Sequence, residues 1–83
     1  LTYASPLYVT VLLKGKEIPE HIHEYQADIL FPLKGSGTIW IDGVGDRIIK
    51  PGISVCIACG TKHRIYSVQQ DLLLYDVFCP ALT

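Results

Sequence analysis

The 83-residue sequence contains no methionine, only three histidines and three cysteines, and no run of lysine or arginine. With a formal charge of −1 and a pI of about 6.3, it has no basic surface suited to nucleic acid. No apolar stretch approaches the roughly 18 residues of a membrane-spanning helix, and no signal peptide is visible. We therefore expect no nucleic-acid partner, no membrane partner and a cytoplasmic location. The missing methionine predicts a processed or trimmed chain, or a piece of a longer protein.

The odd number of cysteines argues against a disulfide framework. Cys56 and Cys59 form a lone C-x-x-C, which has two functional interpretations, a redox pair or half of a zinc site. The redox motif is typical of a helix N-terminus in a βαβ setting, and a structural zinc site needs further ligands. Neither context is visible, so we interpret both residues as packing residues. Cys79 is interpreted as a small apolar residue near the C-terminus.

A helical period is also missing, because no window of 11 or more residues repeats its apolar positions every 3.6 residues. Instead, about eight short β-rich runs alternate with turn signals such as Asp42-Gly43 and Pro51-Gly52. The expected strands cover residues 7–14, the segment of His21 and His23, and residues 28–33, 38–41, 47–50, 53–58, 63–68 and 72–78. This pattern predicts an all-β antiparallel sandwich or barrel.

The apolar content is high for one small domain spanning residues 1–83. Hydrophobic residues make up 49% of the chain, and the mean hydropathy is +0.33. One small globule cannot easily bury so much apolar surface, so we expect a sheet face to be covered by a second copy, as a homodimer, or by a missing segment. Trp40, Tyr66 and Tyr75 are interpreted as core or interface aromatics, with cavity lining as the alternative.

The histidines suggest a metal site. His21 and His23 are two residues apart, and residues i and i+2 of a strand point to the same face. Asp28 follows five residues later at the start of an apolar run, and His63 lies forty residues beyond His23. Three imidazoles and a carboxylate suit one divalent transition metal (Fe, Mn, Ni, Cu or Zn) better than calcium or magnesium.

These residues fall into two motifs that resemble those of the cupin superfamily. The first family motif, G-x5-H-x-H-x3,4-E-x6-G, is matched in every spacing from Gly15 to Gly35, with Asp28 in place of glutamate. The second, G-x5-P-x-G-x2-H-x3-N, is matched from Gly52 to Ser67, with alanine and serine in place of the proline and asparagine. Sixteen residues separate the two motifs, as in a short cupin.

The resemblance implies a small antiparallel jelly-roll β-barrel that binds one metal through His21, His23, Asp28 and His63. Aspartate is one methylene shorter than glutamate, which withdraws the carboxylate by about 1.5 Å. Asp28 therefore either ligates directly, from a backbone that moves inward, or holds a bridging water. Glu24 is an alternative carboxylate, although strand alternation points it away from the side of His23.

Asp76 is unusual because it interrupts the apolar run LLLYDVF. We expect it to pair with Arg47 or Arg64. The alternative is that it faces the cavity as an acid or base.

The resemblance leaves the function open between classes. The first hypothesis is a small metalloenzyme, similar to cupin dioxygenases, isomerases or decarboxylases, acting on a small oxygenated molecule. The second is a non-catalytic ligand-binding or sensor module, alone or as part of a longer regulator. A third is a lapsed site marked by Asp28 and Ser67, against which the retained histidines argue. Fold alone does not decide among these hypotheses.

Overall fold

The computed structural model describes residues 7–79, and every regular element in this range is a β-strand. The strands are β1 (Leu7–Leu12), β2 (Ile18–His21), β3 (Ala27–Ile41), β4 (Gly45–Ile49), β5 (Val55–Ile57) and β6 (His63–Cys79). All of their pairings are antiparallel. The all-β prediction is therefore confirmed. The same range holds no helix of the length and apolarity needed to cross a membrane.

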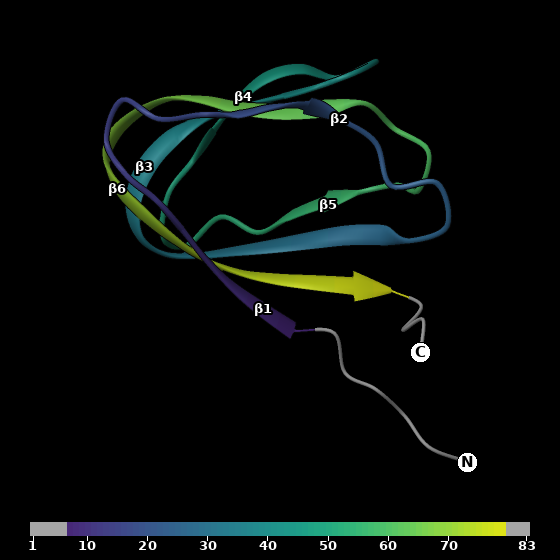
Figure 1. The fold of residues 1–83 in the computed structure, drawn as a ribbon, viewed down its shortest axis with the longest axis horizontal. Helices are drawn as coiled ribbons and strands as arrows, with labels where there is room; N and C mark the ends of the chain where they lie inside the picture. Colours follow the sequence, from purple (N-terminus) through teal and green to yellow (C-terminus); the bar gives the residue numbers. More distant parts are fainter. Residues whose placement is uncertain (1–6, 80–83) are drawn as a thin grey trace.

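The strands form two facing layers, because β3 and β6 are long enough to contribute to both (Figure 1). In one layer, β2 pairs with the first part of β6, which pairs with the last part of β3 and then β4. In the other, β1 pairs with the last part of β6, which pairs with the first part of β3 and then β5. We call these the β2–β4 layer and the β1–β5 layer. Together they make a small jelly-roll barrel.

Two expected strand breaks are instead bends within longer strands. Residues 28–33 and 38–41 both belong to β3, and residues 63–68 and 72–78 both belong to β6. The glycines and polar residues between them predicted turns. In the structure they shift the strand register, with Gly35 at φ +88° in β3 and Ser67 at φ +49° in β6. Both strands pass from one layer to the other at these bends, which close one side of the barrel (Figure 1).

The core lies between the two layers, on the inner face of each strand. Alternate residues of β3 are buried before and after its bend, as period-two strands require. The buried apolar cluster of the described chain draws on every strand except β2: Leu12, Leu30, Ile39, Ile41, Ile49, Ile57, Ile65, Val68, Leu72 and Leu74. Only two polar or charged residues of the described range are buried, Asp28 and His63. The side chains of Asp28 and His63 lie next to each other.

Candidate metal centre

The three histidines meet at one end of the barrel. His21 is the last residue of β2 and His63 the first of β6, and they face each other across the strand pair. Their ring centroids are 4.1 Å apart, and the ring of His23 lies 5.0 Å from His21 and 5.4 Å from His63. One ring nitrogen of each histidine lies within 4.8 Å of the others. The structure therefore brings together all three predicted histidines.

His23 reaches this position by a different route from the one predicted. Strand β2 ends at His21, so His23 lies in the following loop and strand alternation does not orient it. Its carbonyl accepts a hydrogen bond from the Gly60 amide at 2.7 Å, which ties this loop to the one before β6. Its ring packs edge-on against Phe78, with centroids 4.8 Å apart. A loop contact and an aromatic contact thus hold the third imidazole.

The backbone orients the other two rings. The Nδ1–H of His21 donates to the Pro19 carbonyl at 2.8 Å, and the Nδ1–H of His63 donates to the Thr61 carbonyl at 2.9 Å. Because a carbonyl can only accept, each Nδ1 must carry the proton, and in a neutral ring this leaves Nε2 with a free lone pair. Metal-bound histidines commonly use such outer partners to fix the tautomer.

Burial keeps two of these rings neutral. It lowers the pKa of His63, although the Thr61 carbonyl opposes the shift and the other two histidines reinforce it. Burial and the neighbouring His21 lower the pKa of His23. The Nε2 of His63 is buried and has no hydrogen-bond partner. A neutral, unpartnered imidazole nitrogen in this position is a ready metal ligand.

Asp28 faces two of the three histidines from the inner side of β3. Its side-chain Oδ2 lies 3.7 Å from the Nε2 atoms of both His23 and His63. That separation is too long for a hydrogen bond. Two ligand atoms each about 2.1 Å from one ion lie at most about 4.2 Å apart, so 3.7 Å fits a shared ion. The carboxylate is not among the three residues whose ligand atoms all lie within 4.8 Å of one another.

For Asp76 the sequence favoured an arginine partner over a position facing the cavity, and this order of preference is wrong. Asp76 faces Leu30 across the β3–β6 ladder, on the same inner face as Asp28, and the two carboxyl groups are hydrogen-bonded. The expected pairing with an arginine is wrong: Arg64 instead lies over the ring of Tyr66, at 4.1 Å from its centroid. The inner face is set by the alternation of Asp76 with the buried Leu72 and Leu74, a signal visible in the sequence.

The two carboxyl groups hold one proton between them at neutral pH. Burial, the hydrogen bond with Asp28 and the negative charge of Asp28 together raise the pKa of Asp76 to about 8, although His23 and His63 oppose the shift. Burial also raises the pKa of Asp28, but the hydrogen bond from Asp76 opposes that shift. The proton therefore resides on Asp76, and Asp28 is the member of the pair that is available as an anion.

The cysteines and the other predicted candidates lie away from this cluster. Glu24 is exposed in the loop after β2. Cys56, Cys59 and Cys79 are free and exposed, so the interpretation of Cys56 and Cys59 as packing residues is wrong. Cys56 is exposed because the short strand β5 lies at the edge of its layer, where alternate residues face outward. In the part of the chain described, the residues grouped as potential metal ligands include no cysteine.

The predicted aromatic candidates lie on the outer faces of the barrel. Trp40 and Tyr66 line a shallow pocket of about 320 Å³ that also contains Arg64, and the Tyr66 hydroxyl donates to Asp46. Trp40 alternates with the buried Ile39 and Ile41 of β3, so its side chain points outward.

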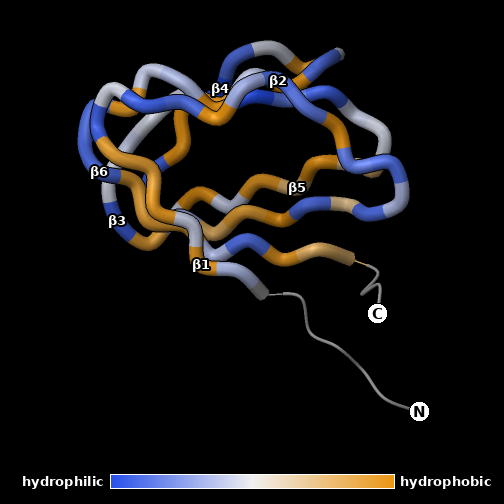
Figure 2. Tube along the Cα trace, viewed as in Figure 1, coloured by the Kyte–Doolittle hydropathy of each residue, from blue (hydrophilic) through white to orange (hydrophobic). Residues whose placement is uncertain are grey.

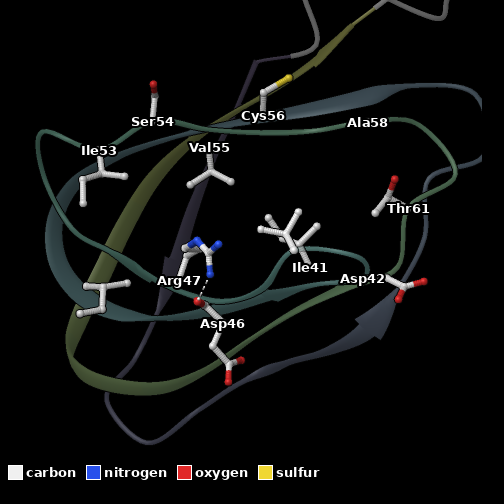
Figure 3. A pocket seen from close by; sticks show the side chains of 12 residues that line it. Ile41, Asp42, Asp46, Arg47, Ile53, Ser54, Val55, Cys56, Ala58 and Thr61 are labelled. Carbon is white, nitrogen blue, oxygen red and sulfur yellow. Dashed lines mark hydrogen bonds between the residues drawn. The ribbon is translucent and has the colours of Figure 1, made fainter.

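A larger cleft of about 800 Å³ opens along the edge where β4 and β5 face each other (Figure 3). Apolar side chains such as Ile41, Val55 and Ile53 form most of its wall. None of the three histidines lines it, but Thr61 does, and the Thr61 carbonyl orients His63. The cleft therefore lies next to the cluster without containing it.

The donor set fits a transition metal. Within residues 7–79, the buried side-chain atoms without a hydrogen-bond partner are Asp28 Oδ1, His63 Nε2 and Asp76 Oδ1. Such atoms are rare in folded proteins, since burying a polar group without a partner costs about 1–3 kcal/mol. All three belong to the histidine–carboxylate cluster. Imidazole and carboxylate together suit iron, manganese, nickel, copper or zinc, and the ligands do not decide among these metals.

Comparison with known proteins shows the same fold in enzymes of several kinds. A structure described as a predicted oxalate decarboxylase from Thermotoga maritima has 27% identity and a TM-score of 0.79 over 93% of this chain and 65% of its own. DMSP lyase from Ruegeria pomeroyi (22% identity, TM-score 0.83) and ectoine synthase from P. lautus (23%, 0.80) each match 93% of this chain. The aligned part is 39% of the lyase and 54% of the synthase.

This chain therefore spans less than two thirds of the length of each of these three proteins. No curated protein matches it. The model of the cupin domain family matches residues 8–78, which include both motifs and the whole histidine–carboxylate cluster. The chain belongs to the cupin domain family.

Proposed function

We propose that this cupin domain binds one divalent transition metal through His21, His23 and His63, with Asp28 as a fourth ligand, and that it acts as a metalloenzyme on a small oxygenated molecule. One observation carries the proposal. Backbone carbonyls hold the Nδ1 atoms of His21 and His63, which leaves both Nε2 atoms free, and the Nε2 of His63 lies 3.7 Å from the buried carboxylate of Asp28. An arrangement with this many unpartnered polar atoms is difficult to explain by folding alone.

The chain's own residues have distinct roles in this proposal. His21 and His63 are fixed by the backbone, whereas His23 is held by a loop and by Phe78. Asp76 is a positioning residue, because its hydrogen bond holds the carboxyl group of Asp28. A bound transition metal would supply Lewis-acid polarisation of a substrate oxygen, or a site for dioxygen.

The mouth of the site has one apolar wall. The ring of Phe78 packs against both His23 and Tyr8, with the Tyr8 centroid 5.6 Å from that of Phe78. This wall shields one side of the cluster from water. We expect the substrate to be small, because the strands leave the histidines at the barrel end rather than in the large edge cleft.

The structural relatives support an enzyme without selecting its reaction. The three proteins compared above carry the descriptions of a decarboxylase, a lyase and a synthase. The relative with 27% identity is described as a predicted oxalate decarboxylase, so small carboxylates are the first substrates to test. Each of these proteins is longer than this chain, and parts outside the shared barrel can contribute to their reactions.

A non-catalytic ligand-binding or sensor module is the second candidate. Asp76 is the one acidic or basic side chain beside the proposed ligands in the described range, and it is engaged with Asp28. A domain that only binds a metal and a small molecule needs no further proton donor.

The first experiment measures metal in protein purified without a metal-affinity column. We expect close to one transition-metal ion per chain by elemental analysis, and loss of that ion in the His21→Ala and His63→Ala variants. Glu24→Gln is the matched control, because Glu24 is an exposed carboxylate outside the cluster and its loss should leave metal content unchanged. Metal far below one ion per chain that cannot be restored by added metal would contradict the metal centre.

The second experiment separates an enzyme from a binding module. Metal-loaded protein is incubated with ¹³C-labelled small carboxylates, oxalate first, and products are followed by NMR. Turnover that disappears in His63→Ala supports the enzyme. Binding of a carboxylate, seen by calorimetry, without any product supports the sensor module instead.

A further inference from the structure

The edge cleft of about 800 Å³ has no role in the proposed metal centre. It lies where the two layers end, because β4 and β5 each pair with β3 on one side only. Its volume is within the roughly 300–1,000 Å³ of small-molecule sites. Its wall includes the exposed Val44 and Ile53 and the half-buried Val55, and Figure 2 shows β5 as hydrophobic along its length. A hollowed apolar surface of this kind is typical of a ligand site.

The strand register directs one cationic side chain, Arg47, into this apolar cleft. Arg47 lies opposite Ile39 in the β3–β4 ladder, and Ile39 is fully buried on the inner face. Residues directly opposite each other point to the same side of a sheet, so Arg47 leaves β4 toward the other layer. Figure 3 shows its side chain directed from β4 toward Val55 of β5. The inner face of β4 therefore carries an arginine at a position where strand alternation would place a core residue.

The positive charge of Arg47 has no counter-ion among residues 7–79, because the ion pairs of this range contain no arginine. Its Nη1–H donates to the backbone carbonyl of Asp46 at 2.7 Å, and this acceptor is neutral. The Asp46 carboxylate instead accepts from the Tyr66 hydroxyl, and Figure 3 shows it directed away from the guanidinium. Asp42 borders the cleft at the end next to Thr61. Most of the five donors of the guanidinium are therefore left for water or for a ligand.

From this arrangement we propose that the edge cleft is a second ligand site, which binds a monocarboxylate with an apolar body. The apolar wall holds the body of the ligand, and the planar guanidinium of Arg47 holds its carboxylate through two parallel hydrogen bonds. A cationic ligand would be repelled by Arg47, and a neutral one would cover its charge without pairing it. A ligand with several negative charges is disfavoured, because Asp42 and Asp46 also border the cleft. One negative charge on an apolar body fits this set of side chains best.

Arg47 has a second physical explanation, which predicts different behaviour. An inward-pointing charge on an edge strand prevents the strand from pairing with the edge of another molecule, and β4 is such a strand. That role requires only the charge, and it involves no ligand and no hollow beside the arginine. It predicts that loss of the charge causes self-association and leaves the binding of small molecules unchanged. The ligand site predicts the reverse, so one substitution at Arg47 separates the two explanations.

Calorimetric titration with octanoate tests the site, with acetate and 1-octanol as partial ligands. Acetate has the carboxylate without the apolar body, and octanol has the body without the charge. Octanoate should bind at least about 10-fold more tightly than either. Arg47→Gln removes the charge and should weaken octanoate binding by roughly 10- to 100-fold while leaving octanol binding unchanged. Arg64→Gln is the matched control, because Arg64 is an exposed arginine that lies over the ring of Tyr66, outside the cleft, and it should bind octanoate as the native chain does.

Absence of octanoate binding overturns the proposal, and so does acetate binding of equal affinity, because a carboxylate bound at the metal or on the surface needs no apolar body. Unchanged octanoate affinity in Arg47→Gln also overturns it, and self-association of that variant in sedimentation would then assign Arg47 to edge protection. Far-UV circular dichroism establishes that each variant is folded. If Arg47→Gln does not fold, Ile53→Ser tests the apolar wall, with an expected loss of roughly 10-fold and refutation by unchanged affinity. Elemental analysis of the same samples reports on the metal centre separately.

Discussion

Gly35 provides the sharpest test of how the barrel is closed. It lies at the bend of β3 with φ +88°, in the left-handed region that favours glycine. A Cβ atom added there would lie 2.0 Å from the carbonyl oxygen of Asp71 and 2.8 Å from the Cα of Leu72. Both of these are backbone atoms of the β6 bend, which cannot turn aside as a side chain can. The two long strands therefore cross at a point where only glycine fits.

The expected cost of Gly35→Ala has two parts. The left-handed conformation costs an alanine about 1–2 kcal/mol, partly offset by about 0.4–1 kcal/mol because alanine restricts the unfolded chain. Relief of the 2.0 Å contact requires the backbones to separate by about 1 Å, and such overpacking costs about 1–3 kcal/mol. We therefore expect the free energy of unfolding to fall by about 3 kcal/mol.

Gly52→Ala is the matched control, because Gly52 has a similar φ of +93° but nothing within 4 Å of its added Cβ. It should lose only the conformational part, about 1 kcal/mol. The difference of about 2 kcal/mol corresponds to roughly 8–16 °C in Tm for a domain of this size. Urea and thermal denaturation of metal-free protein, at one protein concentration, measure both variants. Equal losses in the two variants would show that the bends do not approach as closely as described.

Three further predictions concern the metal centre. His23→Ala should weaken zinc or cobalt binding by at least about 100-fold in calorimetry, since it removes one of three imidazoles, and unchanged affinity would remove His23 from the ligand set. Asp28→Asn should weaken binding by about 10-fold whereas Glu24→Gln should not, and equal effects would contradict a role for the buried carboxylate. In metal-free protein, Asp76→Asn should flatten the fall in stability between about pH 4 and pH 8, because the folded protein retains a proton up to about pH 8 that the unfolded chain releases near 3.8. Such a pKa difference would be worth about 6 kcal/mol in a dry site, and screening at this half-exposed carboxyl reduces it to about 2 kcal/mol. Parallel urea-stability profiles of the two proteins against pH would refute this role of Asp76.

The sequence predicted the barrel and its histidine cluster, but not for all of the reasons given. The motif spacing identified His21, His23 and His63, and the structure brings their rings together. The argument that His23 shares a strand face with His21 is wrong, because β2 ends at His21, two residues before His23. The Gly60 amide and the ring of Phe78 orient His23 instead. Such contacts join segments far apart in the chain, so no local period reveals them.

The predicted number of strands is wrong for a related reason. Glycine and polar residues at 34–37 and 69–71 are the usual signals of a turn, and eight separate strands were expected. The same residues also permit a bend, and the local sequence does not distinguish the two. Strand pairing decides between a turn and a bend. The first half of β6 pairs with the second half of β3, and the second half of β6 pairs with the first half of β3, so both strands continue through their bends. The close approach of Gly35 to Asp71 is the tertiary contact that fixes this choice.

For Asp76, strand alternation indicated the inner face, but the expectation of an arginine partner was given more weight. An aspartate in an apolar strand suggested a compensating arginine, since buried charges are usually paired. Its alternation with Leu72 and Leu74 placed it on the inner face, whereas Arg64, the one arginine of β6, is exposed. The structure satisfies the burial in another way, because Asp76 keeps its proton and donates to Asp28. An anionic Asp28 and a neutral Asp76, beside His23 and His63 rings whose pKa values are lowered by burial, form a negatively charged group without a cation among the described residues near it. A divalent metal would balance that charge, so the electrostatics of the metal-free site and the donor set lead independently to the same ligand.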